Sequence, residues 1–177
     1  FTETNRPLVI VVETERLRLR HFTIDDAGFI LRLLNEPSFI KNITDKGVRT
    51  LDDAQAYILS GPLASYQRFG FGLNQVELKD GGVPIGMCGL LKRDALEDAD
   101  LGYAFLPEYW SNGYARESAA AVMAGASRTF GLRRVVAVTK TDNERSIRVL
   151  EKLGFRYANM ITLHEHEPAI KLFASDL

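Results

Sequence analysis

The first stretch of the chain alternates between apolar and charged residues and predicts a strand that leads into a helix. Between Arg16 and Arg20, basic and apolar residues exchange at every position, which is the period of a strand with one buried face. Thr23 and Asp26 then stand at the spacing of a capping box, with Asp where Glu is usual. The apolar residues that follow predict a helix that ends at about Asn35.

The middle of the chain predicts a short helix and then three strands. A second helix-start signal at 50–53 precedes a helix expected at 54–59, and 40–46 is expected to connect the two helices. Apolar runs and turn residues then alternate, with the Asp-Gly-Gly sequence at 80–82 predicting a hairpin turn. The strands expected in this part of the chain are 71–78, 84–91 and 100–106.

The second half of the chain alternates between strands and helices. An Ala-rich segment at 115–130 predicts a long helix that stops at Gly131, and 143–153 has helical spacing and closes at Gly154. The strands expected around these helices are 134–139, 155–163 and 169–174. The pattern predicts a mixed α/β sheet covered by helices, in a single domain that spans 1–177.

Composition limits the partners that the protein can have. The chain has 22 Lys and Arg against 23 Asp and Glu, and its net charge of −1 provides no general attraction for nucleic acid or an anionic membrane. No apolar run approaches the ~18–20 residues of a membrane span. Cys88 is the single cysteine and cannot form an internal disulfide, which favours the reducing cytoplasm. We therefore expect no nucleic-acid partner, no membrane and no metal.

The turn before the helix at 115–130 has the composition of an anion-binding site. Gly113 permits a close approach of the backbone, and the free N–H groups of a first helical turn can bind a phosphate without a lysine. The candidate donors are the amides of Ser111, Asn112, Gly113, Tyr114, Ala115 and Arg116. The segment matches neither a P-loop nor a dinucleotide-binding fingerprint. Taken alone, it is also compatible with an ordinary turn before an amphipathic helix.

A second polar cluster follows the strand expected at 134–139. Asn143 and Ser146 open the helix that Gly154 closes. Asn143 can simply cap this helix and Ser146 can face solvent, so the cluster alone does not define a function. The order of the two segments along the chain is a more specific signal of function than either segment alone.

The two segments together resemble the GNAT superfamily of N-acetyltransferases. In that family a strand, a Gln/Arg-x-x-Gly-x-Gly/Ala turn and a helix bind the diphosphate of acetyl-CoA, and Trp110-Ser-Asn-Gly-Tyr-Ala115 is similar to this motif. Trp110 in place of Gln or Arg is typical of the ribosomal-protein N-terminal acetyltransferase branch, the RimJ/RimL type. The resemblance also includes Thr14–Arg20, Leu101–Phe105 and Lys152–Phe155, and it covers about 14–177.

The resemblance implies a fold, a cofactor and a set of binding residues. The fold is the GNAT fold, a mixed and mostly antiparallel sheet of about seven strands flanked by about four helices. The acetyl donor is acetyl-CoA, a cosubstrate bound without a metal. Its pantetheine arm pairs with the backbone as an added strand. The residues implied are Tyr103, Ala104 and Phe105 for this arm, the amides at 111–116 for the diphosphate, and Asn143 and Ser146 as further contacts.

The resemblance also implies direct transfer from the thioester to an amine, without an acetyl-enzyme. Such a transfer needs a neutral amine, a polarised carbonyl and a proton for the leaving thiolate. Ser146 matches the position whose hydroxyl can hydrogen-bond the sulfur, and Asp100 is the first candidate for the general base. A solvated carboxylate at a strand edge is the alternative interpretation of Asp100. His164 and Glu165 rank behind it, and Cys88 is expected to be a packed residue rather than a nucleophile.

The acceptor remains open at this point. We expect an N-acetyltransferase that acts on a primary amine, with a protein N-terminal α-amino group as the first candidate. The alternatives are a small-molecule amine (a polyamine, an aminoglycoside or an amino acid) and a non-catalytic module that binds acyl-CoA. The resemblance places the acceptor site within about 29–68, with 36–39 as a candidate rim. The acidic run at 94–108 can attract a cationic amine or form an ordinary charged loop. We expect a monomer or a homodimer.

Overall fold

The computed structural model describes residues 7–177 and is built on one mixed sheet of eight strands. From edge to edge the strand order is β1-β2-β3-β4-β5-β6-β8-β7. The strands are β1 (Ile10–Glu13), β2 (Leu17–His21), β3 (Leu73–Leu78), β4 (Pro84–Leu91), β5 (Asp100–Phe105), β6 (Arg134–Thr139), β7 (Arg156–Ile161) and β8 (Ile170–Asp176). Because β5 and β6 are parallel and the other neighbouring pairs are antiparallel, the expected mixed, mostly antiparallel sheet is confirmed.

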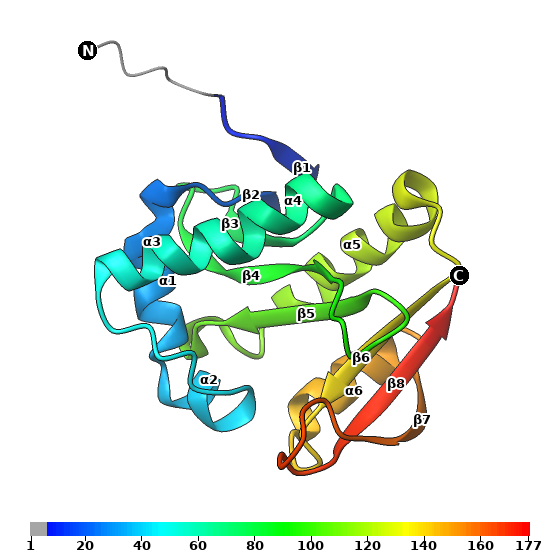
Figure 1. Cartoon of the computed structure of the whole chain (residues 1–177). Coiled ribbons are helices and arrows are strands. Elements are labelled where there is room, and N and C mark those ends of the chain that lie inside the picture. The colour runs from blue at the N-terminus through cyan, green and yellow to red at the C-terminus, as the bar shows by residue number, and fades with distance from the viewer. Residues whose placement is uncertain (1–6) are drawn as a thin grey trace, which may run out of the picture.

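Helices cover both faces of the sheet (Figure 1). The α-helices are α1 (Ala27–Leu34), α2 (Pro37–Asn42), α3 (Leu51–Ile58), α4 (Ala64–Phe69), α5 (Tyr114–Phe130) and α6 (Glu144–Lys152). The shorter helical turns are η1 (Ile24–Asp26), η2 (Leu59–Leu63) and η3 (Pro107–Tyr109). α5 and α6 share one hydrophobic cluster with the sheet, and α1, α2 and α3 share a second cluster with it. We refer to these sides of the sheet as the α5/α6 face and the α1/α3 face.

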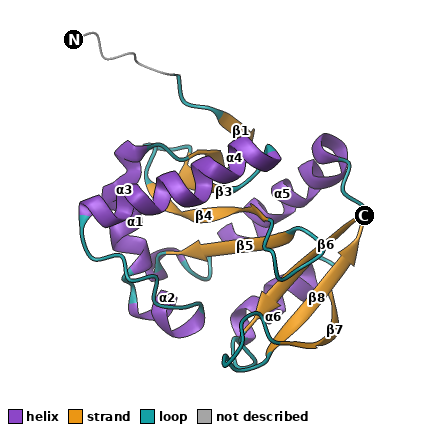
Figure 2. Ribbon diagram, viewed as in Figure 1, coloured by secondary structure: helices purple, strands orange, loops and turns teal. Residues whose placement is uncertain are grey.

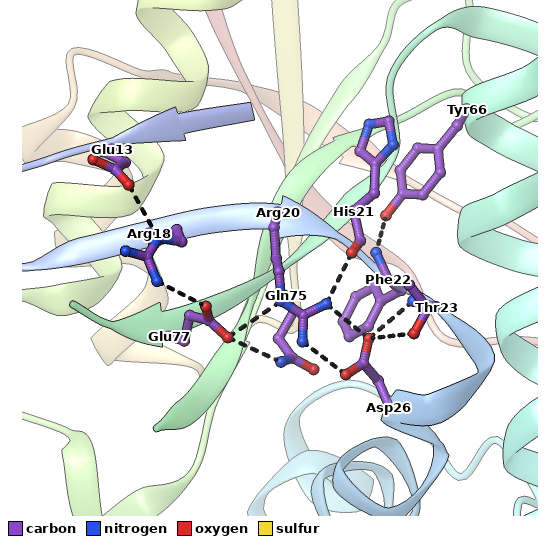
Figure 3. Close-up of polar contacts among 10 residues, drawn as sticks. All are labelled: Glu13, Arg18, Arg20, His21, Phe22, Thr23, Asp26, Tyr66, Gln75 and Glu77. Atoms are coloured by element: carbon purple, nitrogen blue, oxygen red, sulfur yellow. Dashed lines mark hydrogen bonds and ion pairs between the residues drawn. The ribbon is translucent and has the colours of Figure 1, made fainter. Parts of the chain in front are cut away.

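The alternation at the start of the chain divides β2 between the two faces as predicted. Leu17 and Leu19 are fully buried on the α5/α6 face. Arg20 points to the other face and is also buried, because two carboxylates surround its guanidinium (Figure 3). Its Nη2 lies 2.8 Å from Asp26 Oδ1, and its Nε lies 3.2 Å from Glu77 Oε2. The predicted capping box, which contains Asp26, is thereby tied to the sheet.

The long helix on the α1/α3 face differs from the sequence prediction. α3, η2 and α4 form one continuous helix from Leu51 to Phe69, whereas the sequence predicted an end at Leu59. The prediction was wrong here because Pro62 lacks an N–H and normally ends or kinks a helix. The chain passes Pro62 in the wider π-helical turn of η2 and then continues as an α-helix.

Two further elements were missing from the prediction. α2 begins at Pro37, a residue suited to the first helical position, and it occupies part of the connection expected at 40–46. β1 adds an eighth strand at the sheet edge, although Ile10 and Val11 are 51% and 45% exposed. A strand without a buried face lacks the alternating pattern that identified β2. The single domain predicted for the whole chain includes residues 1–6, which lie outside the described residues.

Candidate active site

β5 and β6 are paired at one position and then separate. Asp100 is the strand partner of Val136, whose N–H donates to the Ala99 carbonyl at 3.0 Å. Beyond this pair the two strands diverge, as Figure 2 shows. β5 stays paired with β4 as far as Phe105. The other edge of β5 therefore offers backbone groups that have no partner in the sheet.

Strand alternation decides which backbone groups of β5 point to this diverging side. Leu106 donates its N–H to the Ile85 carbonyl of β4 at 2.9 Å, and the Ala104 carbonyl also faces β4. Tyr103 and Phe105, at the alternate positions, direct their backbone groups away from β4. Of the three residues predicted to pair with pantetheine, Tyr103 and Phe105 thus have suitable backbone directions. Ala104 instead packs its side chain on the α1/α3 face.

The loop at 111–116 presents a row of free amides at the start of α5. Glu117 is the first helical residue to donate back, to the Gly113 carbonyl at 3.0 Å. Within residues 7–177, no acceptor of the chain takes the loop amides that precede it. Ser111 and Gly113 have φ angles of 63° and 81°, the left-handed conformation that favours glycine. The Asn112 side chain donates to backbone carbonyls within the turn, which supports the predicted anion site.

Trp110 occupies the motif position where Gln or Arg is usual, and its contacts explain how it fits. Its indole N–H donates to the Phe105 carbonyl at 2.9 Å, so the ring closes the end of β5. The Arg145 guanidinium lies 4.7 Å from the centroid of the Trp110 ring and donates to Ser111 Oγ at 2.8 Å. Trp110 thus holds the strand end and supports a cation beside the loop.

A second arginine lies at the other end of the 111–116 loop. The Arg16 guanidinium is 4.4 Å from the centroid of the Tyr114 ring, and its Nε donates to Glu117 Oε1 at 2.8 Å. Because Glu117 also accepts from Thr14, the start of α5 is fixed against the β1–β2 connection. The charge of Arg16 is offset by its ion pair with Glu117, so Arg145 is the cation of the two that can complement an anion at the loop.

The side chains of Tyr103 and Ser146 meet on the α5/α6 face. Their hydroxyl oxygens lie 2.7 Å apart, and the Tyr103 hydroxyl oxygen also lies 3.2 Å from the Ser146 carbonyl oxygen, so its single proton has two acceptors within reach. Burial raises the pKa of the Tyr103 hydroxyl above its ordinary value. Ser146 stands in the first turn of α6, where Asn143 Oδ1 accepts its N–H at 3.3 Å. Asn143 is therefore the N-cap of this helix.

Asp100 lies on the opposite face of β5 from the Tyr103 side chain, because the two positions differ by an odd number of residues. Its side chain is 1% exposed, and Arg93 Nε lies 3.2 Å from its Oδ2. Burial raises the pKa of Asp100, and the charge of Arg93 opposes this shift. Asp100 is thus a buried, ion-paired carboxylate rather than a solvated one.

The remaining candidates lie apart from this arrangement. Cys88 is fully buried, and burial raises the pKa of its thiol to about 12, so its prediction as a packed residue is confirmed. His164 and Glu165 are exposed in the connection between β7 and β8. In the part of the chain that the structure describes, no group of three or more His, Cys, Asp or Glu is placed to hold a metal ion. No described helix is long and apolar enough to cross a membrane.

Several polar residues of the site were not found from the sequence. Arg16 and Arg145 carry no signal beyond their charge, because their contacts with the 111–116 loop depend on the packing of separate elements. The phenol of Tyr103 could have been placed on the α5/α6 face from strand alternation, since Leu101 and Phe105 share its face.

The sequence matches a family model described as an acetyltransferase (GNAT) domain over residues 16–156. This match covers more than half of the chain and includes β5, the 111–116 loop and α6. The protein therefore belongs to the GNAT family and is an N-acetyltransferase, as predicted from the two motifs.

Individual relatives agree with this assignment. The uncharacterized N-acetyltransferase YoaA of Bacillus subtilis (strain 168) is 28% identical over 159 residues, which are 89% of each chain. An acetyltransferase of known structure from Agrobacterium tumefaciens str. C58 has a TM-score of 0.80 and 22% identity, covering 97% of this chain and 95% of that one. The ribosomal L7/L12 alpha-N-protein acetyltransferase RimL, in complex with coenzyme A, has a TM-score of 0.82 and 16% identity, covering 95% and 98%. These two structures share the fold.

Proposed function

We propose that the protein transfers an acetyl group from acetyl-CoA directly to a primary amine. The observation that carries this proposal is the hydroxyl pair of Tyr103 and Ser146, 2.7 Å apart beside the divergence of β5 and β6. β5 leads from Tyr103 to the free amides of the 111–116 loop. One strand therefore connects the hydroxyl pair, which suits the thiol end of the cofactor, with the amides, which suit its phosphates.

The chemistry of these residues fits acetyl-CoA. The amides at 111–116 provide donors for a diphosphate, and Arg145 beside them provides positive charge. The backbone of Tyr103 and the N–H of Phe105 are directed to the diverging side, where an extended pantetheine arm can pair with them. When bound, acetyl-CoA supplies an activated acetyl group and a thiolate leaving group.

Ser146 is assigned the role of donating a hydrogen bond to the leaving sulfur. A serine hydroxyl has one proton, so it can serve the sulfur only if its partner donates to it. Because burial raises the pKa of Tyr103, the phenol stays protonated, and in this assignment it gives its single proton to Ser146 Oγ at 2.7 Å rather than to the more distant Ser146 carbonyl. Tyr103 therefore positions the Ser146 proton, and Ser146 makes the contact with the reacting atom.

Asp100 is assigned the role of general base on the α1/α3 face. Acid and base then lie on opposite faces of β5, so the attacking amine and the departing sulfur are served by different groups. The raised pKa makes the Asp100 carboxylate a better proton acceptor than an exposed one, and the charge of Arg93 favours its ionised form. The amine proton passes to Asp100 directly or through a water molecule.

Two kinds of acceptor remain within this proposal. A protein N-terminal α-amino group is the first candidate, in line with the resemblance to the RimJ/RimL branch. A small-molecule amine is the second, and a pocket of about 270 Å³ on the α1/α3 face favours it. Both kinds of acceptor use the same cofactor site. They differ in which part of the acceptor contacts the α3–η2–α4 helix.

The test is a calorimetric titration of acetyl-CoA, followed by an assay of thiol release with peptides, polyamines, aminoglycosides and amino acids as acceptors. Saturable binding together with turnover on one class of amine supports the proposal. Binding without turnover on any of these amines contradicts acetyl transfer to them, and absence of binding contradicts the cofactor assignment.

A further inference from the structure

A pocket of about 270 Å³ lies between the continuous α3–η2–α4 helix and the ends of two strands. Tyr57 and Pro62 line it from the helix, while Leu73 of β3 and Leu91 of β4 line it from the sheet. The π-helical turn around Pro62 forms part of this wall, and such turns are frequent at functional sites. The size and the mainly apolar lining suit a ligand no larger than an amino acid.

The pocket adjoins β5 on the face that carries the candidate base. Leu91 is the strand partner of Asp100, and the Leu91 and Leu73 side chains both pack over Gly102. A Cβ at Gly102 would lie only 3.1 Å from Leu91 Cδ1. Arg93, which pairs with Asp100, is separated from Leu91 by one residue. A ligand in the pocket would therefore be close to the reacting strand.

The charged groups that line the pocket are positive. Arg68 and Lys92 both line it, and no Asp or Glu does. Within residues 7–177, neither cation is paired with a carboxylate: the Arg68 guanidinium lies over the Phe69 ring, and Lys92 Nζ donates to backbone carbonyls. The pocket thus favours a ligand with a negative group.

A cationic acceptor would need negative groups at the pocket, and the acidic run at 94–108 does not provide them. Asp98 Oδ2 lies 3.5 Å from Arg134 Nε, and Glu108 forms an ion pair with Arg32. These two carboxylates have partners of their own, and neither they nor Asp94 and Glu97 line the pocket. A polyamine or an aminoglycoside would be repelled by the unpaired cations of the pocket. The pocket therefore favours an amine that also carries a negative group, such as an amino acid.

We propose that this pocket binds the acceptor and that the acceptor is an amine carrying a carboxylate and a small apolar side chain, of which an amino acid is the simplest example. Leu73 and Leu91 contact the apolar side chain, and Arg68 and Lys92 bind the carboxylate. The amine lies toward Leu91, the strand partner of Asp100, and because Asp100 is buried and does not line the pocket, the amine proton reaches it through a water molecule. This inference rests on the proposed acetyl transfer, because it assigns the acceptor of the same reaction.

The first test compares leucine with leucinamide, which has the same side chain and amine but no negative charge. Thiol release from acetyl-CoA should show a kcat/KM about tenfold higher for leucine, as expected for a partly exposed charged hydrogen bond. Spermidine and a peptide with an N-terminal leucine should be poorer acceptors. Leucinamide as good as leucine, or turnover with spermidine or the peptide alone, would overturn the inference and leave acetyl transfer intact.

The second test removes the cations one at a time. Lys92→Gln, which can keep a donor to the backbone carbonyls, and Arg68→Ala should each raise KM for leucine by about fivefold with little change in kcat. Neither should change KM for leucinamide. Arg128→Ala, which removes an exposed arginine in the last turn of α5, is the control and should change neither. Equal effects on the two acceptors would contradict a carboxylate contact.

A third measurement does not depend on turnover. N-acetylleucine, the expected product, is titrated by calorimetry into the protein saturated with coenzyme A, with N-acetylleucinamide as the comparison. If N-acetylleucine binds and Lys92→Gln weakens this binding, the pocket assignment is supported, even if no amine in the assay is acetylated. The absence of acetylation would then count against the proposed function alone. Equal binding of acid and amide, or binding of neither, would refute the assignment.

Discussion

Replacing Ser146 with alanine removes the hydroxyl that is proposed to contact the leaving sulfur. The Tyr103 oxygen lies 2.7 Å from this hydroxyl, and the backbone N–H of Ser146 is held by Asn143 Oδ1 at 3.3 Å. A hydrogen bond to a charged group contributes about 1.5–3 kcal/mol. If this contribution arises as the thiolate departs, Ser146→Ala should lower kcat by about 10- to 100-fold.

The role of Tyr103 can be separated from that of Ser146 with a double-mutant cycle. Tyr103→Phe removes a bond between two neutral hydroxyls, which is worth about 1 kcal/mol, so kcat should fall by about fivefold. If Tyr103 acts only by positioning the Ser146 proton, the double variant should be no slower than Ser146→Ala alone. Two independent contributions would instead multiply.

The assay is steady-state thiol release at saturating acetyl-CoA, with the Kd for acetyl-CoA measured separately by calorimetry. The Kd should stay close to that of the unmodified protein, because the proposed contact with the sulfur strengthens as the thiolate departs and not when acetyl-CoA binds. A folded Ser146→Ala variant with unchanged kcat would refute the role in leaving-group stabilisation. A fall in cofactor affinity with unchanged kcat would show that Ser146 acts in binding.

Three further predictions concern the loop, the base and the core. Gly113→Asp places a carboxylate at a φ of 81° beside the amides, so calorimetry should show a loss of acetyl-CoA affinity of more than about tenfold. Asp100→Asn should lower kcat/KM and remove the acidic limb of its pH profile, which lies above the ordinary Asp range because burial raises the Asp100 pKa. Arg20→Met should lower the free energy of urea unfolding by about 3 kcal/mol. Arg18→Met, at a side chain 31% exposed, should cost less than about 1 kcal/mol.

Each of these predictions has a result that contradicts it. Unchanged affinity in folded Gly113→Asp would remove the 111–116 loop from the cofactor site. In the unmodified protein, activity should fall at acidic pH because protonation removes the base. An acidic limb that persists in Asp100→Asn would therefore belong to another group. Equal losses of stability for Arg20→Met and Arg18→Met would show that burial of the Arg20 network is unimportant.

The parts of the fold that could be predicted from the sequence are those with local patterns. The alternation from Arg16 to Arg20 and the capping-box spacing depend on neighbouring residues only, and both are present in the structure. The 111–116 loop is similarly local, because a strand, a turn glycine and a helix start follow one another directly. Its free amides are a consequence of helix geometry and need no distant contact.

The parts that could not be predicted depend on contacts between distant segments. Tyr103 and Ser146 are 43 residues apart, and their pairing requires that α6 pack on the same face as the Tyr103 side chain. The passage of the helix through Pro62 likewise depends on its packing against the sheet, which outweighs the local tendency of proline to end a helix. Arg93 could be placed against Asp100 only once the register of β4 and β5 was known.

The register of β4 and β5 is therefore the feature on which the proposed chemistry depends most. It runs without a break from the Gly86–Phe105 pair to the Leu91–Asp100 pair. Along β5, odd positions face the α5/α6 side and even positions face the α1/α3 side, so a shift by one residue against β4 would exchange the two sets. Gly86 helps to hold this register, because a Cβ there would lie 2.5 Å from the Ala104 carbonyl oxygen. A side chain at this position would force β4 away from β5 and disturb the register that places Leu91 and Arg93 beside Asp100.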